Sequence, residues 1–388
     1  MLSAGTRASP DLNDGLTALL QSARRDAALV EERRELTDDL SEGITRAGFT
    51  RHFVPRRWGG AAGDFTSLLR STASVAEACA STAWCAALYA AHARLAAYLP
   101  EEAQRDLWAH TPDVRIAASV VPPQGTATAV PGGWSLSGRW SFASGVAHAD
   151  WVLLASWTRS APCGAHPDGQ REHRIFAVPR AHLTIVDTWH TLGLRGTGSN
   201  AVQADGAHVP AHRSLLLTDL IPASAGGARC HAVPFPMVAG LQFAAPILGA
   251  ARGALQAWVR GSREREGSGS QEVPASAKFQ RALARSSGEI QAAQLLLEQA
   301  AHRADHETPT ALNIAENQRN AAMAAEWCAR AVDRLFRVQG VRGQAEGDPV
   351  QRHWRDVTAA AGHATLGFEM AATAYAQAVF DRTAPPGA

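Results

Sequence analysis

Cysteine is scarce in this chain, and its distribution excludes two common uses. The sequence holds five cysteines in 388 residues, and no two of them form a Cys-x-x-Cys pair. An odd number of scattered cysteines fits neither a disulfide framework nor a structural zinc site. We therefore expect free thiols and a reducing, cytoplasmic environment for Cys79, Cys85, Cys163, Cys230 and Cys328.

The sequence also lacks an excess of one charge and any long apolar run. Lysine and arginine number 37 against 36 aspartate and glutamate, which gives a net charge of +1. Basic residues do not gather in one tract, so no nucleic-acid surface is expected. No run of about 18 apolar residues occurs, so no membrane span is predicted. The N-terminus lacks the apolar stretch of a secretory signal.

Nucleotide-binding and metal-binding patterns are missing too. Gly193, Gly196 and Gly198 are not in Gly-x-Gly-x-x-Gly order and do not lead from a strand into a helix. Neither a nicotinamide site nor a phosphate loop is therefore predicted. His302 and His306 stand four residues apart, but an arginine follows the first and no third ligand is evident. This favours an exposed helix end over a metal site.

Three textures follow one another along the chain, which is 46% hydrophobic and 19% charged. Residues 11–110 show the apolar periodicity of helices. From about 112, prolines, paired glycines and short β-branched or aromatic runs predict a small β domain, with a polar loop at 158–173. Helical texture returns at about 237 and lasts to Phe380. Breaks are expected near Gly261–Pro274, Thr308-Pro309 and Gly340–Pro349.

Strict alternation marks the stretch Trp134–Trp151. Bulky or small apolar residues occupy every second position up to Trp140, with serine and arginine between them. Phe142-Ala143-Ser144-Gly145 ends the pattern, and another strand is expected over Trp151–Trp157. A hydroxyl on a tight turn between two tryptophan-bearing strands suits a flat, apolar cofactor with one polar edge. The alternative is an ordinary hairpin whose tryptophans fill the core and whose serines face water.

The same stretch resembles a known family. GRWSFASG followed by ADW is similar to the flavin-contacting strands of the acyl-CoA dehydrogenase fold, in particular the oxygenase components of two-component (group D) flavin-dependent monooxygenases. Further segments agree with that branch in order, so that the resemblance covers roughly residues 50 to 370. They are PRRWGG (Pro55–Gly60), CASTAW (Cys79–Trp84), TWHTLGLRGTGSN (Thr188–Asn200) with HVP (His208–Pro210), and QRHWRDVTAAAGHA (Gln351–Ala364).

The resemblance implies a mainly α fold with a central β domain. An N-terminal α-helical domain is expected over residues 1–112, a central β-barrel over 113–222, and a C-terminal four-helix bundle over 223–388. In this fold the bundles pack together, so a homotetramer is expected. Small residues on the C-terminal helices, such as Gly240, Gly249 and Gly253, would allow close packing.

Two histidines gain roles from the resemblance. His92 shares a predicted helix face with Trp84 and Leu88. It would line the substrate pocket beside the flavin, with Trp84 as a wall; the alternative is a histidine at the edge of the core. His363 follows Asp356 by seven residues on a predicted helix, near the same face.

For His363 the resemblance implies a place near flavin C4a, where it would stabilise or protonate a peroxide. Histidine suits that task because its ordinary pKa lies near working pH. The small residues 359–362 would make the helix thin enough for a bulky group to approach. The alternative is a buried polar residue of the bundle.

Other residues would contact the cofactor. The resemblance implies that Ser144 hydrogen-bonds near flavin N5, that Ser119 supplies a second small polar group, and that Trp140 belongs to the flavin-contacting strand. Thr197 and Ser199 would face the pocket from a loop beside the flavin ring. For each of these the alternative is an ordinary turn or strand residue.

Arg263, together with Arg265, follows a predicted helix in SREREGSGS. A solvated charged loop is the simpler interpretation. In the resembled fold an arginine here can reach the phosphate or adenine end of the flavin of a neighbouring subunit.

One missing motif separates two chemistries. An acyl-CoA dehydrogenase needs a carboxylate base, usually a glutamate in a Tyr-Glu-Gly type sequence, and none occurs here; Glu369 sits in GFEMAA. Histidines with a serine suit oxygen activation on reduced flavin instead, where the cofactor carries the difficult step.

The expected function is therefore a reduced-flavin-dependent monooxygenase, the oxygenase component of a two-component system. Reduced FMN or FAD would come from a separate NAD(P)H:flavin reductase, because no nicotinamide site is predicted. With dioxygen as co-substrate, a flavin C4a-hydroperoxide would hydroxylate an aromatic or polycyclic small molecule. The alternatives are oxygenation at nitrogen or sulfur, an acyl-CoA dehydrogenase, and a non-catalytic scaffold of the same fold.

Overall fold

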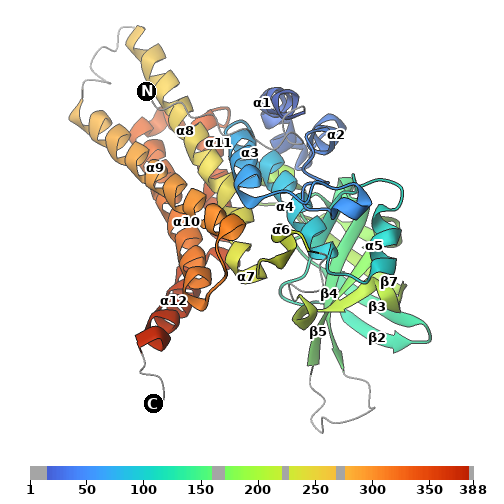
Figure 1. Cartoon of the computed structure of the whole chain (residues 1–388). Coiled ribbons are helices and arrows are strands. Elements are labelled where there is room, and N and C mark those ends of the chain that lie inside the picture. Colours follow the sequence, from blue (N-terminus) through green and yellow to red (C-terminus); the bar gives the residue numbers. More distant parts are fainter. Residues whose placement is uncertain (1–14, 160–170, 221–226, 268–275, 384–388) are drawn as a thin grey trace.

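Helices, a β-sheet and again helices follow one another along the chain (Figure 1). The computed structural model describes residues 15–159, 171–220, 227–267 and 276–383. Most of the predicted loop 158–173, with Cys163, lies outside the described residues.

The N-terminal part packs helices around one another. Two of its helices start at side-chain caps: Asp64 Oδ1 accepts from Ser67 N at 2.6 Å, and Thr37 caps a second helix. One helix, α4, is alanine-rich and buried on all sides, with Ala91 as its only residue outside the buried class. The helices are α1 (Leu16–Arg33), α2 (Asp38–Arg46), α3 (Phe65–Ala76), α4 (Ala80–Ala96) and α5 (Glu101–Trp108).

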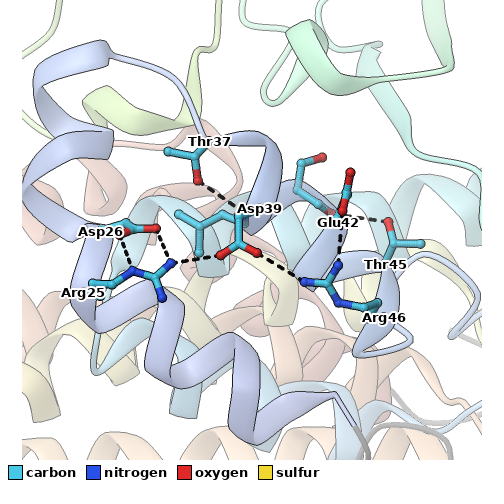
Figure 2. A network of polar contacts seen from close by, with 9 residues as sticks. Arg25, Asp26, Thr37, Asp39, Glu42, Thr45 and Arg46 are labelled. Atoms are coloured by element: carbon cyan, nitrogen blue, oxygen red, sulfur yellow. Dashed lines mark hydrogen bonds and ion pairs between the residues drawn. The ribbon is translucent and has the colours of Figure 1, made fainter.

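Charged side chains join α1 to α2 at the surface (Figure 2). The carboxylate of Asp39 lies between two guanidinium groups, at 2.9 Å from Arg25 and 3.4 Å from Arg46. Arg25 also pairs with Asp26, and Arg46 with Glu42. Because these groups are mostly exposed, we expect the network to orient the two helices and to contribute little stability.

The central part is one mixed sheet. Its strand order is β6-β7-β3-β2-β4-β5-β8, with β1 paired in parallel to β4. This sheet is the central β domain that the sequence predicted; β6 and β8, at its two ends, do not pair with each other in the described residues. The strands are β1 (Ile116–Ser119), β2 (Thr126–Val130), β3 (Gly133–Trp140), β4 (Trp151–Arg159), β5 (Arg171–Pro179), β6 (Thr184–Val186), β7 (Ala201–Pro210) and β8 (Ser214–Leu216).

The C-terminal part consists of long helices, of which α8, α9 and α10 run side by side (Figure 1). All three predicted breaks lie between helices: α8 ends at Gly267, within the first predicted break, and the other two separate α9 from α10 and α10 from α11. The helices are α6 (Arg229–Ala232), α7 (Phe235–Val238), α8 (Leu241–Gly267), α9 (Ala277–His306), α10 (Ala311–Gln339), α11 (Pro349–Ala361) and α12 (Phe368–Thr383).

Three properties of the described residues bear on the classes considered above. The helical segment Phe235–Arg263 is long and apolar enough to cross a membrane, but 83% of its most apolar window is buried inside the fold, as in the core helix of a globular protein. No three histidine, cysteine or carboxylate side chains of the described residues gather as metal ligands. The four described cysteines are buried free thiols.

Candidate functional site

A chain of hydrogen-bonded hydroxyl groups lies between α4 and the sheet. Thr197 donates to the carbonyl oxygen of Leu194 at 2.8 Å, and its Oγ1 lies 2.6 Å from Ser199 Oγ. Ser199 Oγ lies 2.7 Å from Ser144 Oγ, which accepts the indole N–H of Trp84 at 3.2 Å. All three hydroxyl-bearing residues are buried. The structure thus brings together four side chains that belong to three separate motifs of the sequence.

The direction of this chain follows from its ends. A carbonyl oxygen only accepts, so the hydrogen of Thr197 points to Leu194. Ser199 must then donate to Thr197, and Ser144 to Ser199. The hydrogen of Ser144 is therefore in use, whereas its oxygen keeps acceptor capacity. Toward a ligand, Ser144 acts as an acceptor of an N–H or O–H group.

The turn that carries Ser144 is clamped from two sides. Tyr89 of α4 donates to the carbonyl oxygen of Gly145 at 2.7 Å, and Gly145 N donates to the carbonyl of Thr197 at 2.8 Å. Gly145 has a φ of 70°, and a Cβ there would lie 2.5 Å from the Tyr89 hydroxyl. The glycine is thus required by backbone conformation and by space.

Ser119 stabilises the same turn through a hydrogen bond to the backbone that precedes it. It ends β1 and donates to the carbonyl oxygen of Ser141 at 2.7 Å. Gln124, which the sequence analysis did not select, donates to Ser119 Oγ at 3.4 Å and accepts from Ser141 N at 3.1 Å. In the described residues, Ser119 therefore contacts the backbone of the segment that precedes Ser144 in the sequence.

Trp140 does not belong among the side chains that face a cofactor. Its ring is fully buried, and its indole N–H donates to the carbonyl oxygen of Ala155 at 2.9 Å. It packs with Leu136, Val152 and Leu154 in the core of the sheet. For this residue the hairpin alternative, in which tryptophan fills the core, describes the structure.

His363 lies beside the hydroxyl chain, on an aromatic cluster. Its ring stacks on Phe243 with centroids 3.7 Å apart and lies 5.9 Å from the ring of Trp84. Its Nδ1 accepts from Thr365 N at 3.3 Å, so a neutral ring carries its hydrogen on Nε2. Nε2 has no hydrogen-bond partner among the described residues.

Two expectations about His363 were wrong. It is not on a helix face with Asp356, because α11 ends at Ala361 and Gly362 caps it. His363 instead begins a short 3-10 turn, Ala364–Leu366. Burial lowers the pKa of His363 to about 4, so the ring is neutral at neutral pH rather than half-protonated.

Asp356 holds the loop that carries Thr197. Its Oδ1 accepts the backbone N–H of Leu194 at 2.7 Å. Burial raises the pKa of this carboxyl group to about 6. Gly193, the preceding residue, lies so close to the carbonyl oxygen of Arg355 that a Cβ would be 2.0 Å from it. The loop is therefore fastened to α11, and through it to the bundle.

His92 stands further along α4. It follows Trp84 by eight residues, about 12 Å along the helix axis. Its Nδ1 donates to the carbonyl oxygen of Ile116 at 2.8 Å, so Nε2 of the neutral ring is an acceptor. Burial lowers its pKa to about 4. His92 and His363 thus present opposite functions, an acceptor and a donor.

Arg263 lies apart from this site within the chain. It is exposed on α8, not in a loop, and follows Phe243 by twenty residues, about 30 Å along the helix. Arg265 lies on the same helix, and its side chain is outside the described residues.

Sequence reasoning missed two aromatic side chains. Phe243, which stacks on His363, is one of many apolar residues at the start of α8, and nothing in its spacing marks it. Phe142 is 68% exposed at a φ of 67°, and its ring meets that of Trp189 edge-on at 6.3 Å. The sequence signal for Phe142 was its place in the turn segment, two residues before Ser144.

The donor set fits a reduced flavin. Reduced flavin carries a hydrogen on N5, and Ser144 offers an acceptor, whereas N5 of the oxidised ring is itself an acceptor. The exposed Phe142 and half-buried Trp189 provide aromatic surface beside that position for a flat ring.

Known proteins are similar to this chain over nearly its whole length. Residues 241–368 match the family model "Acyl-CoA dehydrogenase, C-terminal domain". The chain is 31% identical to the flavin-dependent monooxygenase oxygenase subunit HsaA of Rhodococcus jostii over 94% of this chain and 97% of that protein. It is also 31% identical to the oxygenase component of the FADH2-dependent resorcinol hydroxylase of a Rhizobium species, over 94% and 92%.

A solved structure extends the agreement to the fold. The crystal structure of 3-HSA hydroxylase from Rhodococcus sp. RHA1 superposes with a TM-score of 0.88, at 30% identity, and covers 96% of this chain and 97% of that one. The relatives are monooxygenases, whereas Glu369, the nearest candidate for a dehydrogenase base, is exposed at the start of α12. The chain belongs to the oxygenase components of two-component flavin-dependent monooxygenases, built on the acyl-CoA dehydrogenase fold.

Proposed function

We propose that this enzyme hydroxylates a ring carbon of a small phenolic or polycyclic aromatic molecule, with Ser144, His363 and His92 as its functional side chains. The observation that carries the proposal is the aromatic cluster of Trp84, Phe243 and His363 directly beside Ser144. Relatives named for resorcinol and p-hydroxyphenylacetate hydroxylation support an aromatic substrate.

Reduced flavin, delivered by a separate reductase, supplies the electrons that activate dioxygen. Ser144 would hold a bound reduced flavin by accepting its N5 hydrogen, and Ser199 and Thr197 fix the orientation of that acceptor. Ser144 is buried under Trp84, which limits the access of water to this position. The hydroxyl chain would thus help to retain a proton at this end of the ring.

The two histidines act on the substrate side. His363 donates through Nε2, and its stacking on Phe243 fixes the direction of that donor. His92 accepts through Nε2, which suits it to accept a hydrogen bond from the hydroxyl group of a phenol and so to orient the ring. Trp84 forms a wall of the site between them.

We also infer a homotetramer. Several large apolar side chains of the C-terminal helices face solvent in the single chain, among them Leu295, Phe368, Met370 and Phe380. A second copy would cover them, and Arg263 of one subunit would then reach the phosphate end of a flavin held by another. Buried free thiols support a cytoplasmic location.

Oxygenation assays test the proposal. The purified protein receives reduced FMN or FAD, dioxygen and one of three probes: a phenol, an arylamine or an aryl thioether. Ring hydroxylation of the phenol, with hydrogen peroxide falling as product rises, is the expected result. Preferential formation of N-oxide or S-oxide would contradict ring hydroxylation. Robust NADH oxidation by the protein alone would contradict the separate reductase.

A further inference from the structure

The loop that carries Thr197 and Ser199 depends on the backbone of one residue, Leu194. Leu194 has a φ of 52°, in the left-handed region that a leucine rarely adopts. Such a conformation costs free energy and persists only where neighbouring groups hold it. The backbone N–H of Leu194 donates to Oδ1 of Asp356 at 2.7 Å. This hydrogen bond therefore offsets the strain at Leu194.

The carbonyl oxygen of Leu194 orients two parts of the proposed flavin site. It accepts the hydroxyl hydrogen of Thr197 at 2.8 Å and the indole N–H of Trp189 at 2.9 Å. The first bond ends the hydroxyl chain and so decides that Ser144 presents an acceptor. The second fixes the ring that meets Phe142 edge-on. A change of backbone conformation at Leu194 would therefore disturb both the acceptor and the aromatic surface beside it.

The residues just before Leu194 are fastened to α11 by other contacts. Arg355 donates to the carbonyl oxygen of Leu192 at 3.2 Å and pairs with Glu31 of α1. A Cβ at Gly193 would lie 2.0 Å from the carbonyl oxygen of Arg355, so the two backbones are in close contact. This segment should keep its place on α11 even when the hydrogen bond to Leu194 is weakened.

We propose that Asp356 is a positioning residue of the flavin site, which holds Leu194 and thereby fixes the acceptor oxygen of Ser144 and its aromatic neighbour. The proposal rests on the role proposed above for Ser144. An ionised carboxylate accepts a backbone N–H more strongly than a neutral carboxyl or amide oxygen does. The strength of this hold should therefore follow the charge of Asp356.

The charge of Asp356 depends on the groups that enclose it. Burial raises the pKa of this carboxyl group to about 6, and the hydrogen bond from Leu194 limits the rise. By reciprocity, ionisation strengthens that hydrogen bond, so the hold should weaken as pH falls through about 6. The nearby thiol of Cys79 stays neutral, because burial raises its pKa. The charged groups that face the carboxyl group from α1 and α11 are Glu31, which raises its pKa, and Arg352 and Arg355, which lower it.

Binding of reduced flavin at different pH values tests the proposal. The affinity of the purified full chain for reduced FMN and reduced FAD is measured by anaerobic titration calorimetry between pH 5 and 8, without substrate. The dissociation constant should rise about fivefold as pH falls through about 6, because a charged hydrogen bond becomes a neutral one. His92 and His363 stay neutral over most of this range, since their pKa values are about 4. A wild-type affinity that does not change around pH 6 would overturn the proposal.

Asp356→Asn separates charge from shape. Its amide oxygen can still accept from Leu194, so the variant should fold, bind reduced flavin about fivefold more weakly at pH 8, and show no step near pH 6. Asp305→Asn is the matched control, because Asp305 also accepts a backbone N–H, that of Phe65 at 2.8 Å, but at the start of α3. It should keep the wild-type affinity and the wild-type step. A pH step that persists in Asp356→Asn would contradict the assignment.

Amide hydrogen exchange gives a readout that does not depend on flavin. Exchange in a peptide that contains Leu194 is followed by mass spectrometry at pH 8, and it should be about fivefold faster in Asp356→Asn than in the wild type or Asp305→Asn. Unchanged exchange would refute the hold on Leu194, whatever the enzyme oxidises. A chain that shows both the pH step and the faster exchange but does not hydroxylate an aromatic ring would contradict the proposed function and leave the role of Asp356 intact.

Discussion

The two helices α4 and α12 differ in which side chains they bury. In α4 every residue but Ala91 is buried, including His92, Arg94 and several hydroxyl-bearing side chains. In α12, Phe368, Met370 and Phe380 are 42%, 74% and 69% exposed. Polar groups are thus enclosed at one end, and apolar groups are left in water at the other.

This contrast separates the site, which a single chain can form, from the exposed apolar surface, which we expect a second chain to cover. The hydroxyl chain and the aromatic cluster are built from α4, the β-sheet turn, the loop at 194–199, the start of α8 and the residues after α11, all from one chain. The C-terminal helices bury little of α12, so their exposed side chains call for another surface. Catalytic proton handling should therefore depend on the interior, and assembly on the exterior.

The largest effect is expected at His363. His363→Asn keeps a hydrogen-bonding side chain but removes the stacked imidazole donor, so product formation should fall about 100-fold or more while flavin still binds. Product and hydrogen peroxide are quantified per oxygen consumed, with the exposed His302→Asn as control. Full coupling of oxygen to product in His363→Asn would remove His363 from the reaction and leave His92 as the first candidate.

Acid should destabilise the enclosed half. Burial depresses the folded-state pKa of His92 to about 4, below its unfolded value, so the native state binds fewer protons. Its stability contribution, up to about 3 kcal/mol, is present above pH 6.5 and is lost as pH falls toward 4. Urea denaturation between pH 4 and 8 measures this slope. His92→Asn should flatten it; an unchanged slope would contradict the assignment.

Asp356 connects interior and bundle. Asp356→Ala leaves the buried N–H of Leu194 without an acceptor and should cost about 1–3 kcal/mol of unfolding free energy. It should also weaken flavin binding, because the loop with Thr197 loses its anchor. Asp356→Asn retains an acceptor oxygen and should lose less. Equal losses in both variants would show that charge, rather than this hydrogen bond, sets the effect.

Charges introduced on the exposed apolar side chains of α12 test the expected assembly. Met370→Glu with Phe380→Glu places carboxylates on the exposed apolar side chains of α12 and should convert a tetramer into smaller species, as measured by light scattering. Leu217→Glu, exposed but outside the C-terminal helices, is the control. A wild-type monomer at micromolar concentration would contradict the tetramer outright.

The smallest effect belongs to the surface network of Figure 2. Asp39→Asn removes the carboxylate between Arg25 and Arg46, but these groups are exposed and screened, so Tm should change by no more than about 2 °C. Thermal denaturation at low and high salt measures it. A drop comparable with that of Asp356→Ala would show that α1 and α2 depend on this network more than their exposure suggests.

Much of the fold and part of the site could be predicted from local patterns in the sequence. The helix–sheet–helix order followed from apolar period and turn residues, and the family resemblance followed from motifs that lie in turns and loops. Trp84, Ser144, Thr197 and Ser199 each belong to such a motif, and the structure joins them in one hydrogen-bonded chain. Their catalytic roles stay predictions.

The features that local patterns could not predict depend on contacts between residues far apart in the chain. Trp140 lies in a motif that resembles a cofactor-contacting strand, but its side chain is buried in the core of the sheet. Phe243 and Leu194 acquire meaning only from partners far along the chain, His363 and Asp356. The strand order, with β3 between β2 and β7, is likewise set by long-range pairing that alternation alone does not encode.

The clasp between Asp356 and Leu194 has a consequence for biosynthesis. Side chains of the proposed site come from positions 84, 144, 199 and 363, so residues far apart in the chain must come together before the site is complete. Contacts separated by so many residues form late, because the intervening chain must first be ordered. A nascent chain that lacks the residues around 363 therefore has no complete place for flavin and oxygen, and it should not release hydrogen peroxide without product.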